Sequence, residues 1–117
     1  MPRSLQAYLW DMQQAADEIL RFCGGKELTD YESDSMLRAA VERNSEIIGE
    51  ALSQAQRFFP EIVGRVTNEQ QIVAFRNRLI HGYATVKNAL VWDIVQANLP
   101  RFRKEVGELL RQSEEQQ

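Results

Sequence analysis

Apolar residues recur at steps of three and four along most of this chain, the spacing that places side chains on one face of an α-helix. The first run extends from Leu5 to Cys23. Ser4 is suited to cap its start, and Gly24-Gly25 is suited to end it because glycine accepts the left-handed conformation common at helix ends. The longest run, from Met36 to Phe59, stops before Pro60, since the residue preceding a proline is pushed out of the helical region. We therefore predict two long helices, the second of them central.

Two capping-box spacings indicate further helix starts. Thr29 to Glu32 predicts the start of the second helix, either directly or through a short turn around residues 33–35. Thr67 to Gln70 predicts the start of a third helix, which must end near Gly82. Residues 61–66 between these helices are expected to form a connector.

A last apolar run extends from about Asn88 to Leu110 and contains Pro100. This proline either kinks one long helix or lies in the first turn of a separate fifth one. Four amphipathic helices with short connections, and no convincing alternating strand, predict an all-α antiparallel up-and-down four-helix bundle whose last helix is kinked or split at Pro100. At 117 residues, we expect a single domain spanning residues 1–117.

Charge and cysteine content narrow the classes of protein that fit. The formal charge of −3 predicts no broad basic surface, so any RNA contact must come from a local cluster such as Arg76 with Arg78. The lone Cys23 excludes an intrachain disulfide and fits a reducing cytoplasm. No apolar run approaches the roughly 20 residues that a membrane helix needs, and no signal peptide is evident. We expect a cytoplasmic protein without a membrane partner.

The chemically able side chains gather in one stretch, from Arg76 to Tyr83, which contains the only histidine of the chain, His81. An imidazole exchanges protons near neutral pH, and a guanidinium binds a phosphate through two parallel hydrogen bonds. Asn77 could orient the imidazole or the phosphate, and Tyr83 could stack on a base. Together with Arg78, these residues suit metal-independent RNA cleavage, in which the ribose 2′-hydroxyl attacks the adjacent phosphate. An arbitrary Arg-x4-His pattern in a helix is nevertheless most often structural.

The geometry of the stretch suggests an incomplete site. On an ideal helix Arg76 and His81 lie about 140° apart, so they serve one pocket only if the arginine curls round or the helix loosens before Gly82. Cleavage through the 2′-hydroxyl also needs both an acid and a base, and the chain has one histidine. A homodimer that brings two copies of the stretch to one cleft answers this need better than a second proton transfer by Tyr83 or an arginine.

A second candidate site is the row Glu42, Glu46 and Glu50, spaced four apart on the long helix. Such a row can bind metals in di-iron bundles, which also need a Glu-x-x-His pair. Arg78 occupies the required position before His81, so the pair is missing. We interpret the row as a solvated face partly neutralised by neighbouring arginines, and predict no metal site and no cofactor.

Several motifs together resemble the HEPN superfamily, and within it the HepT-like proteins. Residues 76–83 match an Arg-x4-His-x-Tyr motif in which asparagine follows the arginine, and residues 40–51 look like the long-helix signature of these proteins. Residues 91–94 and 98–100 resemble the final helix with its kinking proline. The resemblance covers nearly the whole chain. Residues 61–67 depart from it, because they lack a Pro-Trp pair found in many relatives.

This resemblance implies an all-α homodimer with both motifs facing a shared cleft, and a ribonuclease toxin that cuts RNA rather than DNA without a metal ion. Arg76 would contact the scissile phosphate, His81 would act as acid or base, and Asn77 and Arg78 would support RNA binding. It also implies a type VII-like toxin–antitoxin pair, in which a minimal nucleotidyltransferase antitoxin transfers AMP to the motif tyrosine, here Tyr83.

Two other readings remain open. The bundle could be a non-catalytic companion that binds nucleotide or substrate for a minimal nucleotidyltransferase. Alternatively, it could be a dimeric helical scaffold in which the motif preserves the interface. Substitution of His81 separates the three, since it should abolish cleavage only in a ribonuclease and disturb dimerisation only in a scaffold.

Overall fold

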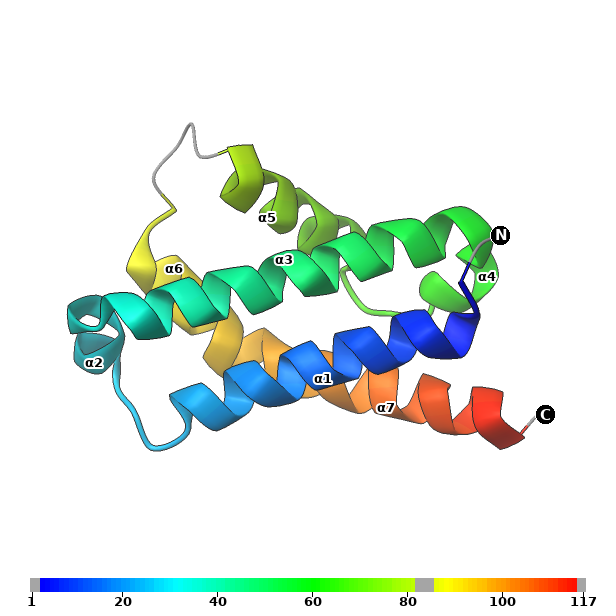
Figure 1. Cartoon of the computed structure of the whole chain (residues 1–117), viewed down its shortest axis with the longest axis horizontal. Coiled ribbons are helices and arrows are strands. Elements are labelled where there is room, and N and C mark those ends of the chain that lie inside the picture. Colours follow the sequence, from blue (N-terminus) through cyan, green and yellow to red (C-terminus); the bar gives the residue numbers. More distant parts are fainter. Residues whose placement is uncertain (1–2, 82–85, 116–117) are drawn as a thin grey trace.

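The computed structural model describes residues 3–81 and 86–115, and these residues form helices and short connections with no strand among them. The helices α1, α3 and α5 and the run from α6 to α7 alternate in direction, as the predicted antiparallel bundle requires (Figure 1). The all-α prediction is therefore confirmed. In chain order the elements are α1 (Leu5–Cys23), α2 (Leu28–Ser33), α3 (Ser35–Phe58), α4 (Pro60–Val63), α5 (Glu69–His81), α6 (Asn88–Asp93), the π-helical segment η1 (Ile94–Asn98) and α7 (Leu99–Glu115).

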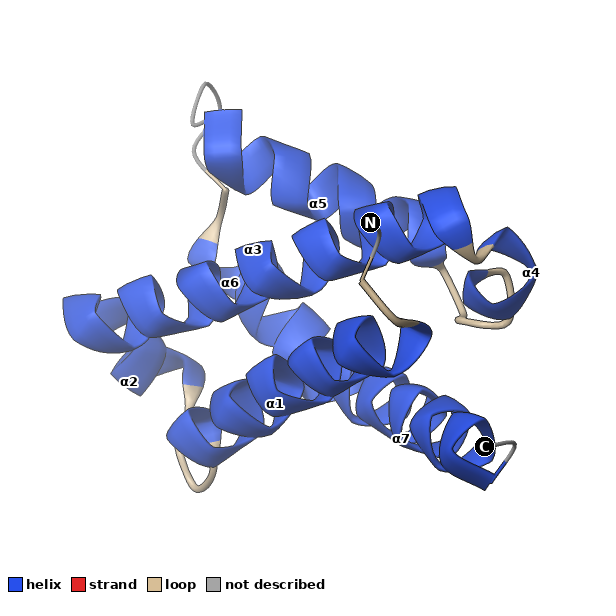
Figure 2. Ribbon diagram, turned by 45° about the vertical axis from the view of Figure 1, so that its right-hand side comes forward, coloured by secondary structure: helices blue, strands red, loops and turns tan. Residues whose placement is uncertain are grey.

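The core lies where α1 packs against α3 on one side and α7 on the other (Figure 2). The apolar stripes of α1, α3 and α7 face this centre, and the burial of these stripes away from water is the main contribution to the stability of the fold. Each long helix keeps a polar outer face, and no helix among the described residues is long and apolar enough to cross a membrane. Fully buried apolar side chains at the centre include Leu9, Met12, Ala16 and Ile19 of α1, Val41, Leu52 and Ala55 of α3, and Val106 of α7.

Polar side chains fix the starts of α1 and α3. The Ala7 backbone N–H donates to the Ser4 hydroxyl over 3.1 Å, which confirms the predicted cap, and Gly25 beyond the end of α1 has the left-handed φ of 74°. Asp34 caps α3 by accepting from the Leu37 N–H over 3.0 Å. The short helix α2 begins at Leu28 with Glu27 as its cap, and the Glu27 N–H donates to Asp30 over 2.8 Å, so Thr29 is its second residue and not its cap. The long helix α3 then begins after a short turn at Asp34, as the second predicted alternative has it.

The connection between α3 and α5 also differs from expectation. Residues 61–63 of the predicted connector belong to the short helix α4 (Pro60–Val63), with Pro60 in its first turn, where its missing N–H leaves no partner unsatisfied. Thr67 does not cap α5. Its N–H donates to the Glu105 carboxylate of α7 over 3.0 Å and its hydroxyl donates to the same group, so it ties this connection to α7. Asn68, which precedes α5, takes a left-handed φ of 60°, a conformation that asparagine tolerates.

Pro100 is the second residue of α7, directly after the π-helical turn η1. Proline has no N–H to donate to the carbonyl four residues earlier, so the regular ladder cannot continue through it. The Leu99 N–H instead bonds the Ile94 carbonyl, a five-residue step that widens the helix locally. Helices α6 and α7 are therefore joined without a gap by the π turn η1. Each of the two predicted alternatives, a kink or a new helix, describes part of this arrangement.

Helix α5 is the outer helix of the bundle. It makes its main contacts with α3 and contains no fully buried residue, whereas α1, α3 and α7 all contribute to the core. Ile72, Val73 and Phe75 are partly buried against the core cluster. In Figures 1 and 2, α5 lies on the side of α3 that faces away from α1 and α7. The element that carries the predicted site is therefore attached to the bundle mainly through α3.

Candidate functional site

The predicted stretch begins on the last turns of α5, and the structure separates its members. Arg76 is partly buried and is directed towards α3, whereas Asn77 and Arg78 are exposed. His81 is exposed and is the last residue of α5. Tyr83, the predicted contact and modification site, lies outside the described residues, as does Gly82. The offset of about 140° between Arg76 and His81 on an ideal helix persists, because α5 remains regular up to His81.

The guanidinium of Arg76 is held by two acceptors. Its Nη2 atom forms an ion pair with the Glu50 carboxylate of α3, and its Nη1 atom donates to the Asn77 side-chain oxygen over 2.8 Å. The Arg76 side chain is 25% exposed and that of Glu50 is 46% exposed, so the pair is partly desolvated but reachable from solvent. An ion pair in such a setting fixes the direction of the guanidinium more than it stabilises the fold. Asn77 thus contacts the arginine, and the two roles predicted for it, orienting the imidazole or the phosphate, stay predictions.

Gly49 allows this arrangement. A β-carbon at position 49 would lie 2.2 Å from the Arg76 Cβ and 2.6 Å from its Cγ, far inside van der Waals contact. Gly49 is buried in the middle of α3, where glycine costs about 1 kcal/mol of helix stability relative to alanine. The absence of a side chain there lets the stem of Arg76 lie directly on the α3 backbone, which places its guanidinium beside Glu50.

Arg76 and Glu50 line a cavity of about 370 Å³ between α1, α3 and α5, which we call the Arg76 groove. The groove is rich in charge of both signs, and its charged residues are Arg3, Asp11, Arg43, Glu46, Glu50 and Arg76. These form three ion pairs, with Arg3 on Asp11 at 2.6 Å and Arg43 on Glu46 at 3.4 Å beside the Arg76–Glu50 pair. A polyanion can bind here only by sharing an arginine that already has a carboxylate partner.

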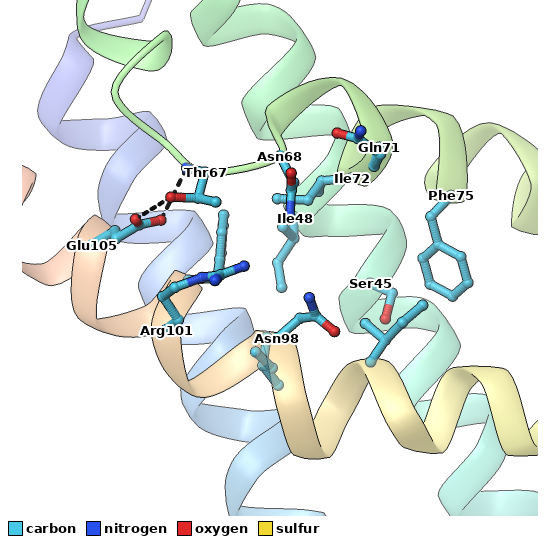
Figure 3. Close-up of a pocket in the computed structure, with 13 residues that line it drawn as sticks. Ser45, Ile48, Thr67, Asn68, Gln71, Ile72, Phe75, Asn98, Arg101 and Glu105 are labelled. Atoms are coloured by element: carbon cyan, nitrogen blue, oxygen red, sulfur yellow. Dashed lines mark hydrogen bonds between the residues drawn. The ribbon is translucent and has the colours of Figure 1, made fainter.

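A second cavity, of about 260 Å³, lies on the other side of α5, between α3, η1 and α7 (Figure 3). Its walls are mostly apolar. Phe75 enters from α5, while Asn98 and Arg101 point into it from the η1–α7 side, and the Thr67–Glu105 hydrogen bonds lie at one end. Its described lining includes neither Arg76 nor His81, so this cavity is separate from the predicted chemistry.

The glutamate row on α3 is divided among different partners. Glu46 pairs with Arg43 and Glu50 with Arg76, as expected for a partly neutralised face. Within residues 3–81 and 86–115, no three side chains of His, Cys, Asp or Glu lie close enough together to hold a metal ion. Within the glutamate row, Glu50 is therefore the residue that contacts the predicted site, because its partner is Arg76.

Glu50 and Gly49 are the site residues that sequence reasoning missed. Glu50 was interpreted only as a member of the glutamate row, and Gly49 only as part of a motif. A signal was present, because a glycine in the middle of a long helical pattern indicates close approach of another backbone or side chain. The identity of the approaching residue comes from a contact 27 positions away in sequence, which local spacing cannot give.

Comparisons with known proteins show the family to which this chain belongs. The sequence profile of the family described as "Ribonuclease HepT-like" matches residues 12–59 and 67–109, which include α5 and Arg76 to His81. The protein named "Putative RNase MJ1380" of Methanocaldococcus jannaschii is 34% identical over 104 residues, which cover 89% of this chain and 94% of that protein. The protein named "Probable ribonuclease HepT" of Thermococcus cleftensis is 32% identical over 107 residues, which cover 88% of this chain and 93% of its own length. Among solved structures, none matches the chain.

Proposed function

The chain belongs to the HepT-like ribonuclease family, and from this premise we propose that it is an endoribonuclease toxin that cleaves RNA without a metal ion. The observation that carries the proposal is the position of Arg76. Its guanidinium is directed by Glu50 and Asn77 in a solvent-accessible groove, on the helix that ends at His81. A guanidinium fixed in this way can bind the scissile phosphate and stabilise the charge that builds on it in the transition state.

In the proposed reaction, Arg76 binds the phosphate and His81 transfers a proton. The ribose 2′-hydroxyl attacks the adjacent phosphorus, and the bond from phosphorus to the 5′-oxygen breaks. Arg78, exposed on the same turns of α5, supports binding of the RNA backbone. The products are an RNA end with a cyclic phosphate and a free 5′-hydroxyl, which defines a chemical signature for the assay.

The decisive experiment compares purified wild type with His81→Ala and Arg76→Ala in an RNA cleavage assay with chelator present. We expect both variants to lose cleavage by at least about 10²-fold, the usual contribution of a general acid–base or charge-stabilising group. Arg111→Ala is the matched control, because Arg111 is an exposed arginine near the end of α7 whose partners are Glu108 and Glu115. Full cleavage by a folded His81→Ala protein would overturn the proposal, and absence of cleavage by wild type would favour the non-catalytic companion.

We further propose that the active species is a homodimer with a composite site. The reason is the offset between Arg76 and His81 on α5, together with the single histidine of the chain. A mixture of His81→Ala and Arg76→Ala proteins, refolded together, would contain one intact Arg76 and one intact His81 per heterodimer. Partial return of cleavage supports a site shared between chains, whereas a heterodimer that forms and stays inactive contradicts it.

The proposal extends to regulation by a partner. A minimal nucleotidyltransferase, encoded beside this chain, would act as antitoxin by transferring AMP to the Tyr83 hydroxyl. Co-expression should raise the intact mass of wild type by multiples of one added AMP group and leave Tyr83→Phe unchanged. A wild-type mass that stays unmodified while growth inhibition is relieved would show that neutralisation occurs by binding alone.

A further inference from the structure

The chain needs a group that removes the proton from the attacking 2′-hydroxyl, and its one histidine can serve as the acid for the leaving oxygen. Given the proposed ribonuclease function, on which this inference rests, we propose that Glu50 is this general base. Its carboxylate is bonded to Nη2 of Arg76, the residue assigned to the scissile phosphate. A group that touches the phosphate-binding guanidinium lies next to the hydroxyl that attacks the same phosphate.

Geometry favours Glu50 over the other carboxylates of the Arg76 groove. Asp11 is bonded to Arg3 and Glu46 to Arg43, so each is held by an arginine other than Arg76. The Glu50 side chain is 46% exposed, and its second oxygen, Oε1, accepts from Gln54 Nε2 over 2.7 Å. Each carboxylate oxygen has two lone pairs, so one lone pair on each remains to accept a proton from a substrate. Gly49 fixes its distance from Arg76, because the arginine stem lies directly on the α3 backbone at this point. The proposed base, Glu50, and the proposed phosphate-binding residue, Arg76, thus lie on two packed helices. The two helices come this close because Gly49 has no side chain.

The guanidinium of Arg76 can serve both groups at once. It carries several N–H donors, and the bonds to Glu50 and Asn77 use one on each terminal nitrogen. The remaining donors on those nitrogens can bind a phosphate oxygen while the carboxylate stays in place.

Every proton in the step has a source and a destination. The Glu50 carboxylate takes the proton of the 2′-hydroxyl as the 2′-oxygen bonds to phosphorus. The bond from phosphorus to the 5′-oxygen then breaks, and the leaving oxygen takes a proton from the protonated imidazole of His81. This leaves a 2′,3′-cyclic phosphate, a 5′-hydroxyl, a neutral carboxylic acid and a neutral imidazole, and exchange with water restores both groups.

The test measures single-turnover cleavage between acidic and alkaline pH for wild type, Glu50→Gln, Glu50→Asp and the control Glu18→Gln. Glu50→Gln keeps an acceptor for Arg76 but removes both the negative charge and the ability to take a proton. We expect it to lose about 10²–10⁴-fold in rate and to lose the fall in rate at acidic pH, which reflects protonation of the base. Glu50→Asp should keep that acidic limb at a reduced rate. Glu18→Gln removes the same charge on α1, where Glu18 pairs with Arg21 outside the Arg76 groove, and should stay within a few-fold of wild type.

Three results separate this assignment from its alternatives. Glu50→Gln that cleaves within a few-fold of wild type, or that keeps the acidic limb, overturns the assignment and leaves Glu50 as a residue that only orients Arg76. If His81→Ala and Arg76→Ala then still lose cleavage, the ribonuclease function stands and the base must come from elsewhere, with a second histidine in the dimer as the first choice. If those two variants cleave normally, both proposals fail.

Discussion

Gly49→Ala tests the arrangement of the site through a single methyl group. The new β-carbon would lie 2.2 Å from the Arg76 Cβ, whereas carbon atoms in contact are about 3.5 Å apart. The shortfall is therefore about 1.3 Å. Neither atom can rotate away, because each is the first atom of its side chain, so α5 must move from α3 by roughly that amount.

The expected cost differs between stability and chemistry. Overpacking costs about 1–3 kcal/mol, and alanine returns about 1 kcal/mol of helix propensity, so the net loss should be about 0–2 kcal/mol. A displacement near 1 Å at a catalytic group can lower the rate by about 10²-fold. We therefore predict a folded protein, with a small shift in urea denaturation and a large loss of RNA cleavage.

Gly107→Ala provides the matched control, since it is the same substitution in helix α7. There the new atom would meet Arg103 Nη1 at 2.7 Å, the end of a flexible side chain that can turn aside. We expect stability within about 1 kcal/mol of wild type and unchanged cleavage. Wild-type stability and cleavage in Gly49→Ala would refute the close approach of α5 to α3, and loss of the whole fold would refute the outer position of α5.

Two further predictions concern buried groups away from the groove. Tyr31 is buried with its ring 5.5 Å from Trp92, and loss of hydration raises the pKa of its hydroxyl to about 12. An unfolded tyrosine ionises near pH 10, so the stabilising contribution is complete below about pH 10 and is lost as the pH rises to about 12. Urea denaturation should show this alkaline loss in wild type and a smaller one in Tyr31→Phe; equal losses would contradict it. Burial also raises the pKa of the Cys23 thiol, so a thiol reagent at neutral pH should react slowly with native protein and fully in urea, and fast native labelling would contradict its buried position.

The periodicity of apolar residues predicted the bundle well, because burial of one face per helix determines which segments are helical. Helix starts were predicted less well. At Ser4 the capping residue is followed at once by the apolar run, so only one start is possible. At Thr29, the neighbouring Glu27 and Asp30 make the capping hydrogen bonds instead. Thr67 instead pairs with Glu105 from α7, a partner 38 positions away that local spacing cannot reveal.

The candidate site was likewise predictable only where its residues are close together in the sequence. Arg76 and His81 are close in sequence, so their pattern is visible in the chain itself. The ion pair that directs Arg76 depends on how α5 packs on α3, and Glu50 lies 26 positions earlier. The packing in turn depends on Gly49, whose effect is the absence of a side chain. Composition and spacing indicate which chemical groups the side chains carry. They do not indicate the contact between α5 and α3, which forms because Gly49 has no side chain.

Because the main contacts of α5 are with α3, the structure predicts where the protein opens locally. Proteins open locally in units whose free energies range from near zero up to that of global unfolding, and elements with few buried apolar contacts open first. No residue of α5 is fully buried, whereas α1, α3 and α7 share the core. Backbone amides of α5 should therefore exchange with deuterium well before those of α3. We therefore expect α5, which bears Arg76 and His81, to open locally while the rest of the bundle stays folded. A ligand that binds only one of these two states of α5 would then change the site, and the free energy needed would be a small fraction of that of global unfolding.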